Sequence, residues 1–240
     1  MPHFVRGSHS TIAGVAILSM HTVSTRALGE QPDVPTFRRL TRSLAVLDAI
    51  LSPVWEDRYY SFNAHWAPGE LMASMRNGQG DQWFAVINAS GIILFGLDHE
   101  SPMYRPDDPW PGVLDGIPPE FAPFRDEPAF DTPNTTFCIW HRAAAPTWER
   151  GPVQFAPGDD PDGSAHLLRH LDGRPETYVA FAAEYYAVAL PLDAVTAIYR
   201  HEPLTDALVA RLNPTLRVHD LASDLAEIGF PEPAEGRWRI

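Results

Sequence analysis

The chain of 240 residues contains no lysine, so all 18 of its basic residues are arginine. Without a side-chain amine the protein cannot form a Schiff base with pyridoxal phosphate. It also lacks the lysine that a phosphate-binding loop or a kinase active site requires. This one absence excludes several large classes of enzyme.

Cysteine is almost absent as well, since Cys138 is the only one. A single cysteine excludes a disulfide within the chain, a multi-cysteine zinc site and an iron-sulfur cluster held by one chain. It lies in an apolar run, which is typical of a buried and inert thiol. This usage fits a reducing cytoplasm, and cytoplasmic localisation is our expectation.

Positive charge is scarce, because 31 acidic residues give a formal net charge of −13. Binding to nucleic acid or to an anionic membrane depends on clustered positive charge, so neither is expected as a partner. No apolar run approaches the roughly 18 residues of a membrane-spanning helix. The charge favours a basic protein as partner.

The first 30 residues do not continue the pattern of the rest of the chain. Residues 12–20 form an apolar run after a stretch with a single arginine, which imitates a signal peptide, but no clear cleavage pattern follows. We expect residues 1–30 to be a disordered or non-native leader, with a secretory signal peptide as the alternative.

Residues 31–157 show the pattern of an α+β domain. In residues 36–51 leucine and phenylalanine recur at intervals of three and four, which predicts an amphipathic helix. Four short aromatic or β-branched segments follow, separated by turn sequences, and these predict an antiparallel β-meander with the helix on its apolar face. The predicted strands are 58–66, 70–76, 82–88 and 92–98.

The remainder of the chain changes character twice. Residues 101–133, here called the wrap, contain nine prolines and are expected to pass around the edge of the sheet before a fifth strand at 135–141. Residues 158–240 show helical spacing and predict a cluster of short helices, expected to belong to the same domain. The predicted helices are 164–171, 175–190, 192–200, 205–212 and 218–228.

One candidate site is the sequence Asp98-His99-Glu100 at the end of the fourth predicted strand. Alternation places Asp98 and Glu100 on one face, where two carboxylates could divide acid and base roles or bind a divalent cation together with His65. The alternative is that the strand leaves the core here and that these residues simply begin the next loop. No cofactor is expected in the preferred interpretation.

A second candidate is a protein-binding surface. The stretch from Asp98 to Asp131 contains nine acidic residues and only two arginines, which gives it a local net charge of −7. Aromatic residues beside arginine are the usual energetic centres of protein interfaces. The predicted binding residues are Arg58, Tyr60, Trp66, Arg76, Trp83, Glu100, Asp107 and Asp108.

Three short motifs carry a family resemblance. They are W-x-x-R-Y-Y-S-F-N at residues 55–63, M-x-S-M-R-N-G at 72–78 and H-E-S-x-M at 99–103, together with the C-terminal helical segment. In these motifs, residues 44–231 resemble a family of uncharacterised bacterial proteins. The family implies no activity, and immunity proteins of bacterial toxin systems share this general character only by analogy.

Two hypotheses follow from these features. The first is an acidic cytoplasmic protein-binding module, for example an immunity protein that neutralises a basic effector. The second is a metal-assisted hydrolase that uses Asp98 and Glu100. The sequence offers no complete catalytic motif, so the first is preferred.

Overall fold

The computed structural model describes residues 22–232, and its first long element is the helix that covers the sheet. Helix α1 spans Val34–Leu51. It begins after Asp33, whose side chain accepts a hydrogen bond of 2.9 Å from the backbone N–H of Thr36. The apolar positions that predicted this helix are buried against the sheet, among them Phe37 and Leu44. The predicted helix is therefore confirmed.

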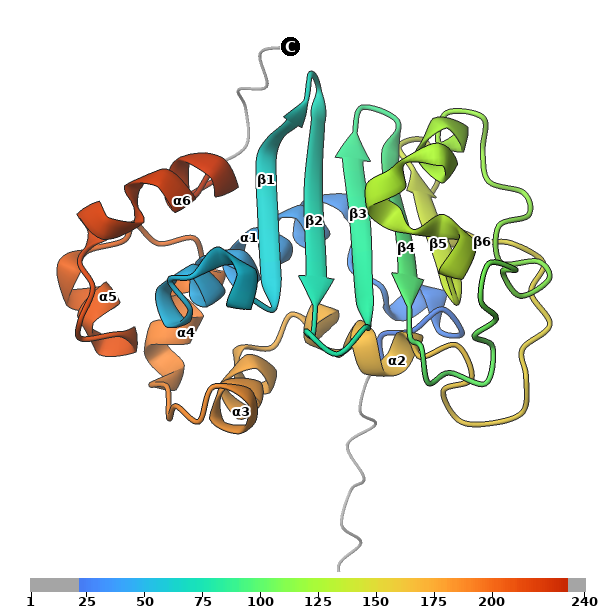
Figure 1. Ribbon diagram of the computed structural model, residues 1–240. Coiled ribbons are helices and arrows are strands. Elements are labelled where there is room, and N and C mark those ends of the chain that lie inside the picture. The colour runs from blue at the N-terminus through green and yellow to red at the C-terminus, as the bar shows by residue number, and fades with distance from the viewer. Residues whose placement is uncertain (1–21, 233–240) are drawn as a thin grey trace, which may run out of the picture.

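A six-stranded antiparallel sheet forms the centre of the molecule, with its strands in chain order (Figure 1). The predicted meander and fifth strand are confirmed to within about two residues. The sixth strand was not predicted, because two residues are too few to show an alternating pattern. The strands are β1 Tyr60–Ala67, β2 Glu70–Arg76, β3 Gln82–Asn88, β4 Gly91–Leu97, β5 Phe137–Arg142 and β6 Glu149–Arg150.

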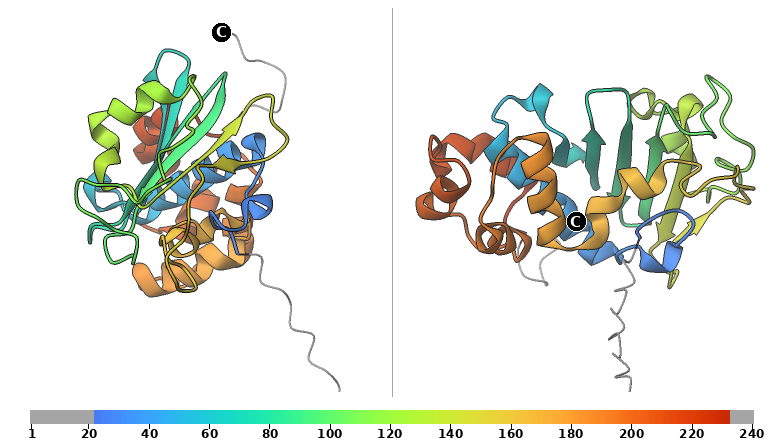
Figure 2. Two further views of the ribbon diagram at one scale, coloured as in Figure 1. Left: turned by 90° about the vertical axis from the view of Figure 1, so that its right-hand side faces the viewer. Right: turned by 90° about the horizontal axis from the view of Figure 1, so that it is seen from below.

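The wrap packs on a face of the sheet, which corrects the expectation that it passes around the edge. Figure 2 shows the sheet edge-on, with the turns of the wrap on one side and α1 on the other. Phe121 and Phe130 of the wrap join a buried cluster with Phe84, Phe95 and other residues of β3–β5. These strands are apolar on both faces, so both faces need a cover. The helical turns here are η3 Ala122–Asp126, η4 Pro128–Phe130 and η5 Thr132–Asn134.

Short helices close the chain, as predicted, and share one core with α1 and the other face of the sheet. Helix α3 ends earlier than predicted, because Ala187 adopts a left-handed backbone conformation at φ 55°. Figure 1 shows α4, α5 and α6 on the side of the molecule where β1 forms the edge of the sheet, with α6 next to β1. The elements are α2 Ser164–Leu167, η6 Arg169–Asp172, α3 Pro175–Tyr185, α4 Leu192–Tyr199, α5 Asp206–Leu212, η7 Val218–Leu221 and α6 Ala222–Ile228.

Residues 22–30 belong to this fold, so the prediction that the leader extends to residue 30 was wrong for these nine residues. Val23 is buried in the core, and the backbone N–H of Thr25 donates a 3.0 Å hydrogen bond to the Ser164 hydroxyl. The hydroxyl of Thr25 also donates to the carboxylate of Asp162. A short helical turn, η1 Leu28–Glu30, follows. The rest of the expected leader, residues 1–21, lies outside the described residues.

Candidate functional site

The wrap presents its acidic side chains to solvent. Three carboxylates predicted to bind a partner, those of Glu100, Asp107 and Asp108, are exposed. Among the described residues, the one ion pair these three make joins Asp108 to Arg105. Three further acids of the same stretch are exposed as well, namely Asp115, Glu120 and Asp126.

Hydrogen bonds and buried aromatic rings fix the wrap in place. The backbone N–H of Met103 and the hydroxyl of Ser101 both donate to the carbonyl of Pro161, at 3.2 and 2.7 Å. The indole N–H of Trp110 donates to the carbonyl of Gln154 at 2.9 Å. The exposed carboxylates therefore project from a backbone whose geometry is set by the folded protein.

The three residues of the Asp98-His99-Glu100 corner have different surroundings. Asp98 is half-buried and its carboxylate accepts a 3.0 Å hydrogen bond from the N–H of Glu100. Burial raises the pKa of Asp98. A Cβ at Gly163 would lie 2.2 Å from Asp98, so this side chain packs directly on a backbone that only glycine provides.

His99 is committed to a partner in the β2–β3 turn. Its Nδ1 lies 2.6 Å from the carboxylate of Asp81, and that carboxylate also accepts a 2.6 Å hydrogen bond from the side chain of Asn77. The hydrogen bond to Asp81 raises the pKa of His99. With Asp98 capping its own turn and Glu100 pointing to solvent, the corner has the character of a strand exit, as the alternative interpretation expected.

The predicted metal alternative requires His65 to join Asp98 and Glu100, and the register of the sheet separates them. Asp98 follows Leu97, which pairs with Gln82 at one end of the sheet, whereas His65 precedes Ala67, which pairs with Glu70 at the other end. Residues 22–232 contain no group of three histidine, cysteine, aspartate or glutamate side chains placed to hold one metal ion. The geometry gives the hydrolase hypothesis no assembled site.

Three of the predicted binding residues are buried and cannot contact a partner. Trp83 is 1% exposed and Tyr60 is 2% exposed, because the sheet register places both on the face that packs on α1. Arg58 is also buried, and its guanidinium forms a 2.7 Å ion pair with Asp224. All three hold the fold together instead.

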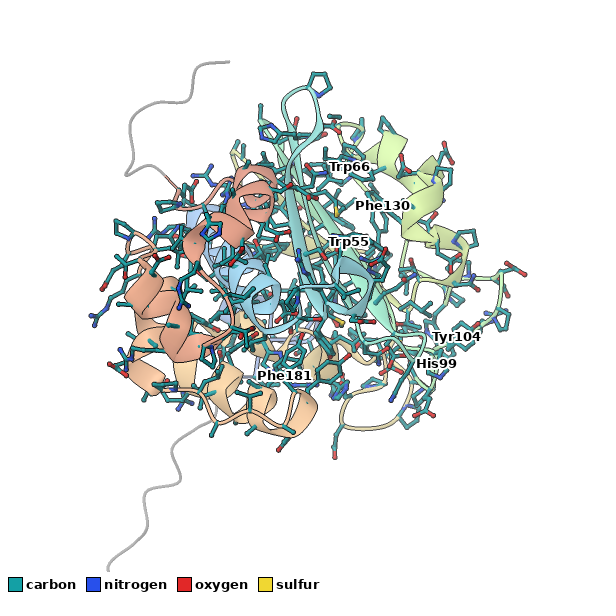
Figure 3. All side chains as sticks on the ribbon, turned by 60° about the vertical axis from the view of Figure 1, so that its left-hand side comes forward. Trp55, Trp66, His99, Tyr104, Phe130 and Phe181 are labelled. Atoms are coloured by element: carbon teal, nitrogen blue, oxygen red, sulfur yellow. The ribbon has the colours of Figure 1, made fainter. Side chains whose placement is uncertain are left out.

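Two predicted binding residues remain on the opposite face. Trp66 is half-buried and stacks on Phe130 of the wrap, with 6.4 Å between ring centroids. Arg76 lies over the ring of Trp55, with 4.3 Å from its guanidinium carbon to the ring centroid. In Figure 3 Trp66 and Phe130 lie together near one end of the sheet, and His99 and Tyr104 lie together near the other.

Trp55 is an exposed aromatic residue that the sequence analysis missed. It lies in the helical turn η2, Trp55–Asp57, and is 41% exposed beside Val54, which is 55% exposed. The two acidic residues that follow Trp55 indicate a solvent-facing turn and could have pointed to it. Of the aromatic and arginine residues predicted to bind, the fold therefore leaves Trp66 and Arg76 at least partly accessible, and Trp55 adds an exposed ring beside Arg76.

Asp48 is a buried carboxylate that the sequence analysis also missed. It is fully buried in α1 and accepts hydrogen bonds from the hydroxyls of Tyr178 and Tyr186, at 2.5 and 3.0 Å, and from the backbone N–H of Tyr60, at 2.6 Å. Burial raises its pKa to about 6. An acid within the leucine stripe of the predicted helix was a visible sign of such a role. Its position joins α1, β1 and α3, so its role is structural.

Among residues 22–232, no helix has both the length and the apolar character needed to cross a membrane. The chain matches no protein-family model, no curated protein and no solved structure.

Proposed function

We propose that the protein is a cytoplasmic binding module that holds a basic partner protein through its acidic wrap, in the manner of an immunity protein that neutralises a basic effector. One observation carries the proposal. The wrap and the strand exit before it expose six carboxylates, those of Glu100, Asp107, Asp108, Asp115, Glu120 and Asp126.

The arrangement suits recognition because the charges are held in advance of binding. The wrap is anchored to the sheet by Phe121 and Phe130, so a partner does not have to order it. Exposed charges of one sign raise the rate of association with an oppositely charged partner more than they raise the final affinity. Trp66, stacked on Phe130 of the wrap, supplies an aromatic and apolar contact at the end of the sheet away from His99.

The test compares two triple variants that remove the same charge from different surfaces. The first replaces Glu100, Asp107 and Asp108 by Gln, Asn and Asn. The matched control replaces three exposed glutamates on the C-terminal helices and their linkers by Gln, namely Glu176, Glu184 and Glu202. Wild-type protein and both variants are used to capture partners from the native host, and the affinity for a captured partner is then measured at low and high salt.

We expect wild type and control to retain the same basic protein and to release it at high salt. Exposed ion pairs contribute about 0.2–1 kcal/mol each, so the wrap variant should bind about 3- to 150-fold more weakly at low salt. A partner that binds the wrap variant as tightly as wild type would refute the proposal. So would the failure of all three proteins to retain any partner.

A further inference from the structure

A cavity of about 320 Å³ lies among α1, α3 and α4, apart from the wrap. Helices α1 and α4 each contribute residues at positions i, i+3 and i+4, which share a helix face. The start of α3 closes the third side. The lining residues are Thr36, Arg39 and Leu40 from α1, Gly173 and Pro175 before and at the start of α3, and Thr196, Tyr199 and Arg200 from α4 and its C-terminal end.

Two arginines give this cavity a positive charge in a protein whose net charge is −13. The guanidinium of Arg39 donates one hydrogen bond of 3.2 Å to the carbonyl of Arg200, which occupies an acceptor at the end of α4 and holds Arg39 at the cavity. The side chain of Arg200 is exposed and forms no ion pair with any residue in the described part of the chain. Most of the guanidinium N–H groups therefore remain available to a ligand.

Two acids, Asp172 and Glu176, each lie one residue from a lining residue in the sequence, and neither forms an ion pair with Arg39 or Arg200. Asp172 is already engaged within its own turn. Its carboxylate accepts hydrogen bonds from the Thr177 hydroxyl at 2.5 Å and from the backbone N–H of Arg174 at 2.9 Å. The Thr196 hydroxyl donates to the carbonyl of Leu192 at 2.7 Å, so it has no free proton for an anion. The guanidinium groups of Arg39 and Arg200 are the donors that a ligand would meet.

The remaining lining is apolar and includes an aromatic ring. Leu40, Pro175 and the ring of Tyr199 contribute carbon surface to the cavity. The Tyr199 hydroxyl is buried and has no hydrogen-bond partner among the described residues. Because this hydroxyl has no surface open to solvent, a molecule in the cavity would contact the ring of Tyr199 and not its hydroxyl.

We propose that this cavity binds a small phosphate monoester, with its phosphate between Arg39 and Arg200 and its organic part against Tyr199. A phosphate monoester carries close to two negative charges at neutral pH, which matches two guanidinium groups. Its oxygens point in several directions and can accept from arginines on different helices, whereas a carboxylate is planar and is satisfied by one arginine fork. The volume fits a small ligand.

The test is calorimetric titration at constant ionic strength with three probes: phenyl phosphate, inorganic phosphate and phenylacetate. The full-length wild-type protein, Arg200→Gln and a control, Arg217→Gln, are compared. Arg200 is exposed and makes no side-chain contact that the fold needs, and Arg217 is an exposed arginine outside the cavity lining. A charge-assisted hydrogen bond lost from Arg200 should weaken phenyl phosphate binding about tenfold or more.

We expect phenyl phosphate to bind wild type and the Arg217 variant equally, and more tightly than the other two probes. Three results would overturn the proposal: no saturable binding of phenyl phosphate to wild type, equal binding to the Arg200 variant, or phenylacetate binding as tightly as phenyl phosphate. The variant of Glu100, Asp107 and Asp108 should bind phenyl phosphate normally, so failure here is distinguishable from failure of the partner-binding proposal.

Discussion

The buried carboxylate of Asp48 makes a quantitative prediction about stability and pH. Replacement of Asp48 by Asn keeps the shape of the protonated carboxyl and removes its ionisation. Burial raises the pKa of Asp48 in the folded protein from its ordinary value of 3.8 to about 6. The folded protein therefore binds this proton more tightly than the unfolded chain does.

The sign of the effect follows from this difference. The stabilisation of the folded protein by proton binding at Asp48 is fully present below about pH 4, where the carboxyl is protonated in both the folded and the unfolded state. This stabilisation is lost as the pH rises towards about 6. One pKa unit corresponds to about 1.4 kcal/mol. Ionisation of Asp48 should thus cost the folded protein about 3 kcal/mol at neutral pH, even though three hydrogen bonds reach the carboxylate.

The assay is urea denaturation of wild type and Asp48→Asn between pH 4 and pH 8. The difference between the two proteins isolates this one group, because other titrating residues contribute to both. We expect the free energy of unfolding of Asp48→Asn to rise by about 3 kcal/mol relative to that of wild type between pH 4 and 6.5, and the difference to stay constant above that pH. As a control, Asp115→Asn, at an exposed site, should show no such change. A difference that is independent of pH, or that moves in favour of Asp, would refute the reasoning and show that the tyrosine hydrogen bonds outweigh burial.

Two further predictions concern other buried polar groups. Arg58→Gln breaks the ion pair with Asp224 and the hydrogen bonds from Arg58 to the carbonyls of Ser52 and Pro53, so urea denaturation should show a loss of about 3 kcal/mol in the free energy of unfolding. The control Arg174→Gln, at an exposed site, should change the free energy of unfolding by less than about 0.5 kcal/mol. Equal losses in the two variants would contradict the buried role of Arg58. Burial lowers the pKa of His170 to about 3, so its ring proton resonances should stay constant in NMR spectra from pH 5 to 8, and a titration near pH 6.5 would contradict this assignment.

The order of elements could be predicted from the sequence because it depends on local patterns. The apolar residues of α1 recur at intervals of three and four, and β1–β4 are short segments that lie between turn sequences. Each of these patterns is visible within one short stretch of the sequence. Bounds agree within about two residues along α1 and the five longer strands. The exposure of Glu100, Asp107 and Asp108 agrees with the general tendency of carboxylates to lie at the surface of a folded protein.

Other features depended on which segments meet in three dimensions. Alternation shows that neighbouring residues of a strand point to opposite faces, but it does not show which face α1 covers, and that choice buried Tyr60 and Trp83. The pairing register, set by contacts between strands, separated His65 from Asp98. The cavity between Arg39 and Arg200 joins residues that lie far apart in the chain, so no sequence window contains it. The sequence by itself determined the elements and the charge of the wrap, whereas packing between distant segments decided which side chains are exposed.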